Sequence, residues 1–320
     1  MAKSYLNIPI ADMKAGDDVE GFFLLSGANV KTSAKGGQFL AGKLKDKSAE
    51  IDFKIWDYAS DIHEQVGSVV KIRGSVSEYN GSTQMIVERI RLAQSSDTYS
   101  LKDLVPCAPI DVDKIAIDVE GMLNGIHDNV YRAIALTAYD RMKDFLKVLP
   151  AAKTIHHAFL GGWLMHTSCM MNMAYSVSEV YGSIVNLDLL LCGAFCHDIG
   201  KRKEYVLSSE TGLVKEYSTK GSLLGHPYMG AAEIAEIAAE LKLDPNDERV
   251  ILLQHMLLSH HGEPDWGAAV APHFLEAEIL YHLDVLDARI EAAREALEGT
   301  EAGAMTDYVK AFGHALYQHH

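Results

Sequence analysis

The segment FCHDIGK, residues 195–201, places a histidine and an aspartate side by side at the end of an apolar run. That run, LDLLLCGAF, has the composition of a buried helix. An ionised carboxylate that leaves water needs a partner, and a metal ion is the strongest partner available. His197 and Asp198 are therefore candidate ligands of a divalent metal.

The sequence holds fifteen histidines, and their placement is more informative than their number. Several histidines and aspartates lie on the inward faces or at the ends of predicted helices: His166, His197, Asp198, His226, His260, His261, Asp284 and Asp287. Each alone could be a hydrogen-bonded core residue, and Asp287 could simply pair with Arg294 or Lys310. Together, imidazole and carboxylate side chains form a ligand set for Mn²⁺, Fe²⁺, Co²⁺, Ni²⁺ or Zn²⁺. The set makes metal binding the favoured interpretation.

Apolar residues recur at helical spacing from about Val112 onward, where strand signals almost vanish. We expect an all-α helical bundle over residues 112–320, with an apolar helix at 115–148 and one hairpin at 204–218. In the last helix we expect one apolar stripe, formed by Ile279, Leu283, Leu286, Ile290 and Leu297. Gly262 is expected to end the helix that His260 and His261 close.

Residues 15–93 alternate and turn like a small β-barrel. Five strand-like runs are separated by KGG, DKSAE and YNGS, which have turn chemistry, and by a short predicted helix at YASDIHEQ. This pattern suits a five-stranded OB-fold, a barrel that binds single-stranded nucleic acids through exposed aromatic and basic residues. We therefore divide the chain into an OB-fold domain at residues 1–95, a linker at 96–111 and an all-α domain at 112–320.

One face of this barrel could bind a nucleic-acid strand. Its candidate residues are Phe22, Phe39, Phe53, Trp56, Tyr79, Lys31, Lys43, Lys45, Lys54, Lys71 and Arg73. Of these, we take Phe39, Trp56 and Lys54 as the substrate-binding candidates. The alternative is that most of the aromatic residues fill the barrel core and that the lysines form a solvated surface.

The formal net charge of −15 is unevenly distributed along the chain. Residues 1–95 carry 12 Lys and Arg against 12 Asp and Glu, so the whole negative balance lies in the remainder. An acidic, histidine-rich half suits divalent cations better than phosphate backbones. No apolar run is long enough for a membrane span and the N-terminus lacks a signal-peptide core, so we expect a cytoplasmic protein.

The order His166, His197-Asp198 and Asp284 resembles the H…HD…D signature of the HD-domain metal-dependent phosphohydrolases. The resemblance becomes more specific in three further motifs, LPAAKTIHHAFLGGWLMHT, GSLLGHPYMG and LLSHHGEPDWG, which follow the predicted OB-fold. Over roughly residues 15–318, this combination is similar to the YhaM-like family of 3′-to-5′ exoribonucleases.

The resemblance implies one or two divalent ions, with manganese preferred and iron, cobalt, nickel, magnesium or zinc as alternatives. It implies a first ion whose ligands are His166, His197, Asp198 and Asp284. A second ion would share Asp198, and its further ligands are implied to be His226, His260 and His261.

The resemblance also implies roles in hydrolysis by a metal-activated water. The residues with implied catalytic roles are Asp198, Lys201, His260 and His261. Lys201 is similar to a lysine that contacts the scissile phosphate in related proteins. His156 and His157 fall within a family motif and are expected to line the substrate pocket.

We expect single-stranded RNA as the substrate, with single-stranded DNA as a further candidate. Two other hypotheses stay open on the residues alone. The first keeps the metal site but assigns it small nucleotides or cyclic (di)nucleotides, which the net charge of −15 mildly favours. The second is a non-catalytic OB-fold binding protein in which the helical domain is a metal-stabilised scaffold. Association into a homo-oligomer is also left open.

Overall fold

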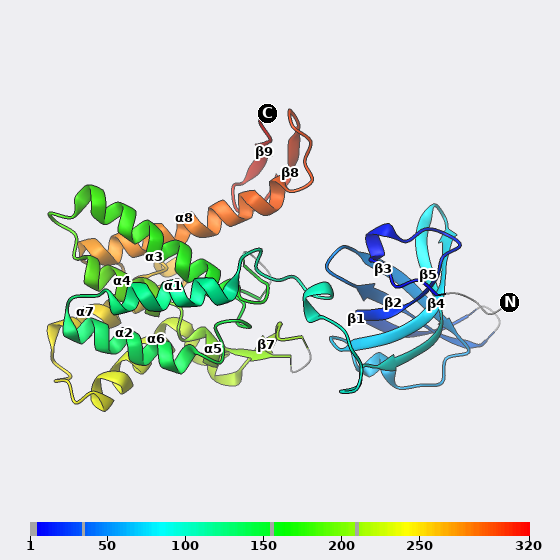
Figure 1. The fold of residues 1–320 in the computed structure, drawn as a ribbon, viewed down its shortest axis with the longest axis horizontal. Helices are drawn as coiled ribbons and strands as arrows, with labels where there is room; N and C mark the ends of the chain where they lie inside the picture. The colour runs from blue at the N-terminus through cyan, green and yellow to red at the C-terminus, as the bar shows by residue number, and fades with distance from the viewer. Residues whose placement is uncertain (1–4, 34–35, 154–156, 209–210) are drawn as a thin grey trace. The chain divides into compact units, whose positions relative to one another are not determined.

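The computed structural model describes residues 5–33, 36–153, 157–208 and 211–320 (Figure 1). The chain divides into two compact units, residues 1–107 with 207–212 and residues 108–206 with 213–320. The first unit is built around a β-barrel and the second is mainly helical. None of the helices within the described residues combines the length and the apolar character that a bilayer crossing requires.

Five strands close into the barrel: β1 (Asp18–Thr32), β2 (Gln38–Lys45), β3 (Glu50–Trp56), β4 (Val69–Tyr79) and β5 (Ser82–Leu92). The strand order is β1-β2-β3-β5-β4, and β4 pairs back with β1. The β3–β5 pair is parallel, whereas the other neighbouring pairs are antiparallel. A five-stranded barrel of this kind confirms the predicted OB-fold. The predicted short helix between β3 and β4 is a 3₁₀ turn at Ile62–Glu64.

Alternation of side chains along the strands builds the barrel core. The inward-facing apolar residues of β4 include Val70, Ile72 and Val76. Phe53 is also in this core, with 1% of its surface exposed, so it does not belong to a binding face. Gly74 lies at a β-bulge where a Cβ atom would be 2.4 Å from the Ile86 carbonyl oxygen, and only glycine fits there.

The helical unit is made of eight helices within the described residues: α1 (Val112–Asn124), α2 (Asn129–Met142), α3 (Gly162–Tyr181), α4 (Leu187–Cys196), α5 (Lys201–Glu204), α6 (Thr219–Glu240), α7 (Glu248–Ser259) and α8 (Leu275–Leu297). Two small hairpins accompany them: β6 (Tyr205–Leu207) with β7 (Val214–Tyr217), and β8 (Met305–Val309) with β9 (His314–Tyr317). In Figure 1, α8 leads directly into the β8–β9 hairpin at the C-terminus.

Helix α4 is the centre of the helical unit. All of its residues from 189 to 196 are buried, and it contacts α1, α2, α3, α7 and α8. A helix surrounded in this way must be apolar on every side, which explains the run LDLLLCGAF. Asn186 caps the helix by accepting a hydrogen bond from the Leu189 amide. As a result, His197 and Asp198 at the C-terminal end of α4 lie inside the bundle.

The predicted single helix at residues 115–148 is wrong, because the chain forms α1 and α2 there with a break between them. Asp128 lies in the break and accepts hydrogen bonds from the amides of Val130 and Tyr131. These bonds satisfy the first turn of α2 and start a new helix.

The predicted apolar stripe of the last helix is confirmed at Leu283, which is buried, and is wrong at two other positions. Leu286 and Ile290 are 47% and 56% exposed, whereas Asp287 and Glu291 are buried. The inward face of α8 is partly polar because it faces the histidine cluster described below.

The two hairpins differ in how well the sequence predicts them. The β6–β7 pair confirms the hairpin expected at residues 204–218. The β8–β9 hairpin is not predicted, because its residues Met305, Tyr308 and Tyr317 are more than half exposed and carry no alternating apolar pattern.

Candidate metal centre

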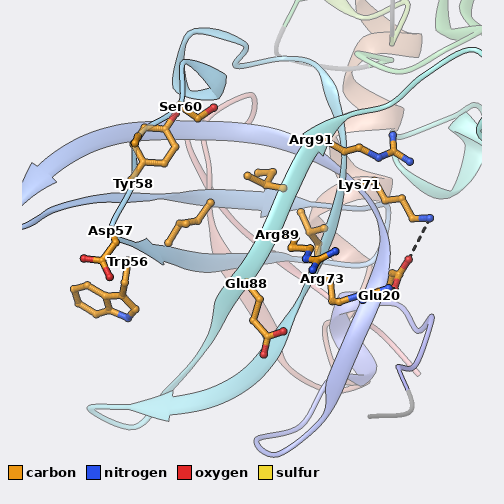
Figure 2. A pocket seen from close by; sticks show the side chains of 14 residues that line it. Glu20, Trp56, Asp57, Tyr58, Ser60, Lys71, Arg73, Glu88, Arg89 and Arg91 are labelled. Atoms are coloured by element: carbon orange, nitrogen blue, oxygen red, sulfur yellow. Dashed lines mark hydrogen bonds and ion pairs between the residues drawn. The ribbon is translucent and has the colours of Figure 1, made fainter. Parts of the chain in front are cut away.

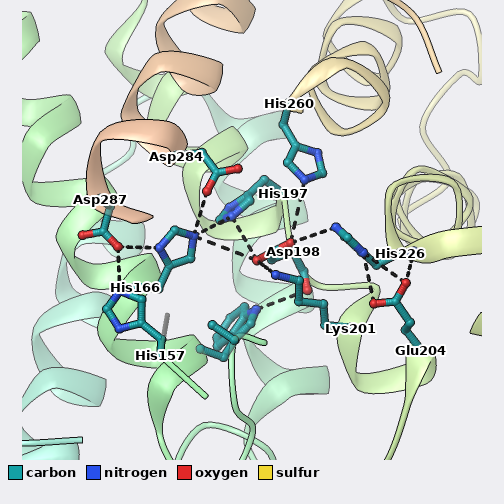
Figure 3. Close-up of polar contacts among 12 residues, drawn as sticks. His157, His166, His197, Asp198, Lys201, Glu204, His226, His260, Asp284 and Asp287 are labelled. Atoms are coloured by element: carbon teal, nitrogen blue, oxygen red, sulfur yellow. Dashed lines mark hydrogen bonds and ion pairs between the residues drawn. The ribbon is translucent and has the colours of Figure 1, made fainter. Parts of the chain in front are cut away.

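Side chains from five helices and their connections converge on Asp198 (Figure 3). His166 comes from α3, His197 and Asp198 from the end of α4, and His226 from α6. His260 and His261 follow the end of α7, and Asp284 lies on α8. The structure therefore brings the residues that the sequence selects as metal ligands into one cluster.

The Asp198 carboxylate occupies the middle of this cluster and is 2% exposed. Its Oδ2 atom is 3.3 Å from His197 Nε2 and 3.9 Å from His166 Nε2. Its Oδ1 atom is 3.3 Å from His226 Nε2 and 3.8 Å from His260 Nε2. Each oxygen of one carboxylate thus faces a different pair of imidazoles, a geometry in which the carboxylate could be shared between two ions.

The first pair of imidazoles turns its Nε2 atoms inward. His166 Nε2 is 3.1 Å from His197 Nε2 and 3.3 Å from Asp284 Oδ1. His197 donates from Nδ1 to the Ala194 carbonyl oxygen at 2.8 Å, which leaves the Nε2 lone pair of a neutral ring facing the cluster. An imidazole lone pair beside two carboxylates is a site that attracts a cation.

The second group consists of His226, His260 and His261, whose ligand atoms lie within 4.8 Å of one another. His260 donates from Nδ1 to the Leu257 carbonyl oxygen at 2.7 Å, and His226 Nδ1 is 3.1 Å from the Glu204 carboxylate. Both rings are thereby fixed with Nε2 toward Asp198, as metal-binding histidines are in proteins.

The position of His226 depends on a kink in α6. Gly225 has a φ of 71° and a ψ of 155°, which interrupt the helix. His226 then begins the second part of α6, with Pro227 in the first turn, where a missing amide proton costs no helical hydrogen bond. The His226 amide donates to Glu204 Oε1 at 3.0 Å.

Four buried polar atoms of the cluster show whether its residues fit a metal ion. Among the described residues, these atoms have no hydrogen-bond partner: Asp198 Oδ1, His226 Nε2, His260 Nε2 and His261 Nδ1. A buried polar atom without a partner costs about 1–3 kcal/mol, so four such atoms at one place would be expensive. Carboxylate oxygen and imidazole nitrogen are ligands of divalent transition metals, and the residues fit such an ion.

The charges of the cluster shift its pKa values in opposite directions. Burial lowers the pKa of His166, but the carboxylates of Asp284 and Asp287 outweigh burial and raise that pKa to about 10. Burial and the neighbouring His261 and His197 hold the pKa of His260 well below its ordinary value. Burial and His226 lower the pKa of His261 to about 4. His260 and His261 are therefore neutral at pH 7, which is the form of imidazole that binds metals.

Lys201 lies beside the Asp198 carboxylate. Its Nζ atom is 2.6 Å from Asp198 Oδ2, and its side chain is 14% exposed. Burial lowers the pKa of Lys201, but the charge of Asp198 outweighs burial and raises it overall, so the ammonium group stays charged. The cluster therefore holds an ammonium group next to the carboxylate at its centre.

The two neighbouring histidines of the HHAFLGG motif are His156 and His157. His156 lies outside the described residues. His157 is 2% exposed and its Nε2 atom is 2.9 Å from Asp287 Oδ2. This contact places His157 behind Asp287, and a contact of either histidine with substrate stays a prediction.

Two of the grooves on the outer surface of the barrel are lined by several basic residues. One of about 470 Å³ is lined by Lys31, Lys43, Lys54 and Tyr79, and Lys54 Nζ lies 4.6 Å from the centre of the Tyr79 ring. The other has about 600 Å³ and is lined by Trp56, Lys71, Arg73 and Arg91, among others (Figure 2). Its basic residues are partly neutralised, because Lys71 and Arg73 pair with Glu20 and Arg91 pairs with Asp97.

Two of the predicted substrate-binding residues form an aromatic pair on the barrel. Trp56 is 51% exposed, and its ring centre is 5.0 Å from that of Phe39 across the β2–β3 pair. The third, Lys54, lies two residues before Trp56 and lines the smaller groove. All three are on the outer surface of the barrel, and their binding of a strand stays a prediction.

Comparison with known proteins identifies the family of the chain. The HD domain family matches residues 163–289. The 3′-5′ exoribonuclease YhaM of Listeria innocua is 33% identical over 94% of this chain and 94% of its own length, and the YhaM of Listeria welshimeri is equally similar. This chain belongs to the YhaM family. Among solved structures, the second OB-fold domain of replication protein A from Methanococcus maripaludis is 17% identical, covering 30% of this chain and all of that one, with a TM-score of 0.25.

In this YhaM-family chain the HD match runs from just before His166 to just after Asp287 and so contains the whole cluster. Asp287 lies one turn after Asp284 on α8, but its Oδ2 atom contacts His166 Nδ1 at 2.6 Å, on the outer side of the ring. The suggested pairing of Asp287 with Arg294 is wrong, since Arg294 pairs with Glu291. The three residues His157, His166 and Asp287 form a hydrogen-bonded chain.

Sequence reasoning named Asp287 as a candidate ligand, three residues after Asp284 on the same helix face, but did not assign it the task of orienting His166. It missed the other residues that orient the YhaM-family ligands. Glu204, which contacts both the amide and Nδ1 of His226, had no signal in its local pattern. Trp163 had none either, although its indole donates to the Asp198 carbonyl oxygen at 3.2 Å.

Proposed function

We propose that this YhaM-family chain hydrolyses single-stranded RNA from its 3′ end, with one or two divalent ions as cofactors. The observation that carries the proposal is the Asp198 carboxylate, whose two oxygens face separate pairs of imidazoles at 3.3–3.9 Å. Family membership across 94% of the chain supports the same activity.

We assign the ligands in two sets that share Asp198. The first set consists of His166, His197, Asp198 and Asp284. The second consists of His226, His260, His261 and the other oxygen of Asp198. A bound divalent ion polarises phosphoryl oxygens and lowers the pKa of water from 15.7 towards about 7, which supplies a nucleophile at neutral pH. Manganese remains our preferred ion.

The side chains of the cluster then have distinct tasks. Asp284 belongs to the first set because its Oδ1 atom faces His166 Nε2, whereas Asp287 faces Nδ1 and fixes the orientation of the ring. Lys201 places an ammonium group beside Asp198, and it can neutralise charge on the scissile phosphate or on the leaving oxygen. His260 and His261 serve as neutral ligands.

The barrel would hold the strand while its end is degraded. Exposed aromatic rings such as Trp56 stack on successive bases with little sequence preference, and Lys54 contributes a positive charge. Because barrel and metal centre belong to one chain, binding at the barrel raises the effective concentration of the strand at the metal centre.

A gel assay with RNA labelled at its 5′ end tests this function. Metal-stripped protein plus Mn²⁺ should produce a ladder of labelled products that shorten one nucleotide at a time. Asp198→Ala should leave the RNA intact, and a cyclic dinucleotide offered at the same concentration should be hydrolysed far more slowly. Rapid hydrolysis of the cyclic dinucleotide with intact RNA would instead support the small-nucleotide alternative.

A further inference from the structure

The loop after α7 folds back onto a candidate metal ligand. Gly262 has a φ of +76°, and a Cβ atom there would lie 2.4 Å from the ring of Tyr281. Gly267 has a φ of +98°, and a Cβ atom there would lie 3.3 Å from His261 Nδ1. The two glycines therefore let the loop lie closely against the Tyr281 ring at Gly262 and against the His261 ring at Gly267.

This loop presents an exposed tryptophan next to the centre. Trp266 ends the 3₁₀ turn Pro264–Trp266, is 61% exposed, and lies just before Gly267. Its ring centre is 6.3 Å from that of Tyr281, and the planes are inclined by 43°. Tyr281 itself lies one turn before Asp284 on α8. Trp266 is thus next to Gly267, which lies against His261, and Tyr281 is on the same helix as Asp284, one turn away.

The charges around this aromatic pair indicate what it can bind. Glu263 and Asp265 lie on the loop with Trp266, and Glu278 lies one turn before Tyr281 on α8. These carboxylates repel a phosphate, and His282, whose ring is 4.6 Å from Tyr281, pairs with Glu278. An uncharged planar group with exposed π-faces is the ligand that suits such a surface.

We propose that Trp266 and Tyr281 form a subsite for the nucleobase that adjoins the scissile phosphate. The inference rests on the proposed function, since the strand must enter the metal centre for the base to reach this pair. The base stacks on the Trp266 indole, while the phosphate is directed away from Glu263 and Asp265 towards the metal ligands and Lys201. The subsite recognises a π-face rather than hydrogen-bonding groups, so it accepts any of the four bases.

A double-mutant cycle between protein and RNA tests the subsite. The variants are Trp266→Ala, Trp266→Phe and Tyr308→Ala, the last a control because Tyr308 is 70% exposed on the distant β8 strand of the same unit. The substrates are a short single-stranded RNA and the same RNA with an abasic residue at the last or the penultimate position. Steady-state kcat and KM are measured with Mn²⁺ for each combination.

We expect Trp266→Ala to raise KM for the intact RNA about 10-fold, within the range for one stacked base, with little change in kcat. An abasic residue in the subsite should raise the KM of the wild type similarly, and the two losses together should not exceed either alone. Trp266→Phe should restore most of the affinity, and Tyr308→Ala should behave as the wild type.

Two results would overturn the subsite while leaving the proposed function intact. In both, the wild-type enzyme shortens RNA. In the first, the KM increases caused by Trp266→Ala and by the abasic residue multiply when the two changes are combined. In the second, Trp266→Ala leaves KM unchanged. If the wild type fails to shorten RNA at all, the proposed function fails and the subsite with it. Mn²⁺ binding by Trp266→Ala should match the wild type, because Trp266 is not among the ligands.

Discussion

At the residue scale, the cluster is organised by hydrogen bonds on the outer side of each imidazole. Asp287, Ala194, Glu204 and Leu257 occupy the Nδ1 atoms of the four rings that face Asp198. Each contact fixes a ring so that Nε2 points to the centre, and this preorganisation is what tight metal binding requires. The outer contacts are therefore as important to the centre as the ligands.

Replacing Asp287 with Asn should weaken binding of the ion held by His166. The amide keeps the shape but loses the charge that orients His166 and His157, and outer contacts of this kind change metal affinity about 10- to 100-fold. Titration calorimetry with Mn²⁺ measures the change, with Glu295→Gln on the exposed side of α8 as the control. Equal affinities for Asp287→Asn and the wild type would show that this carboxylate has no role in ligation.

Metal binding should release a proton near neutral pH. Without the ion, the pKa of His166 is raised to about 10, so the ring is protonated at pH 7.5 and must lose its proton to become a ligand. Apparent Mn²⁺ affinity should therefore increase about 10-fold per pH unit between pH 7 and 9. Calorimetry in PIPES and in Tris should give binding heats that differ by the ionisation heat of about one proton; identical heats would contradict this account.

The same shift predicts how the metal-free protein responds to pH. Because the folded pKa of His166 lies above the unfolded value of about 6.5, its protonation stabilises the fold fully below pH 6.5. That contribution declines as the pH rises and is lost through pH 10. Bound Mn²⁺ replaces the proton, so the pH dependence of unfolding should become smaller when the ion is present.

At the element scale, the short helix α5 is held between two parts of α6. Its residue Glu204 contacts His226, while Arg202 and Lys203 pair with Glu233, two turns further along α6. Glu233 is fully buried and also pairs with Arg141 of α2 at 3.4 Å. This arrangement leaves Lys201, at the start of α5, directed to Asp198.

Glu233→Gln should destabilise the helical unit and loosen α5. Removing the negative charge leaves three cations without their buried partner, and we expect a loss of about 2 kcal/mol, less than a fully buried pair because the cations are partly exposed. Urea unfolding measures the loss. Glu236→Gln is the matched control, since Glu236 contacts Arg141 and Lys203 but is 60% exposed and should cost less than about 1 kcal/mol. Equal losses in the two variants would show that burial of Glu233 is unimportant.

Elements with a strong local signal were predictable, and those that depend on distant contacts were not. The alternation and turns of the barrel and the apolar run of α4 are local patterns, and both were found. The break between α1 and α2 depends on one cap, Asp128, which an apolar periodicity does not reveal. The prediction for α8 was wrong at Leu286 and Ile290, which are exposed. The buried face of α8 carries Asp287 and Glu291 instead, because this face lies against the histidine cluster.

The site was predictable where polar residues occupy positions at which apolar residues are usual. Histidines and aspartates at the ends of apolar helices stand out, and the family motifs supply their order. Orienting contacts such as that of Glu204 with His226 join residues far from any shared pattern, so they require the folded chain. Phe53 shows the converse, since an aromatic residue in a strand fits a core as well as a binding face.

At the scale of the whole molecule, the net charge is divided unevenly between the part of the chain proposed to bind the strand and the part proposed to hydrolyse it. Residues 1–95 are neutral overall and the remainder carries the net charge of −15. Outside the barrel grooves, an acidic surface repels RNA, and the strand is held by a few basic residues and by stacking. Affinity for a long strand should therefore depend on salt more than affinity for a short one does.

The salt dependence of KM tests this division. Between 50 and 200 mM salt, KM for a 20-nucleotide RNA should rise about 10-fold, as expected for two to three phosphate contacts at a slope of about −0.7 per contact. KM for a dinucleotide too short to occupy the barrel should change about 2-fold or less. Trp56→Ala should raise KM for the long RNA alone. The same salt response for both substrates would contradict a role of the barrel in binding.

The central claim is that Asp198 is shared by two metal sites, and equilibrium dialysis against Mn²⁺ tests it most directly. We predict two ions per chain for the wild type, one for His226→Ala, one for Asp284→Ala, and a loss of tight binding at both sites for Asp198→Ala. Retention of two tightly bound ions by Asp198→Ala, with its fold intact by circular dichroism, would contradict the account.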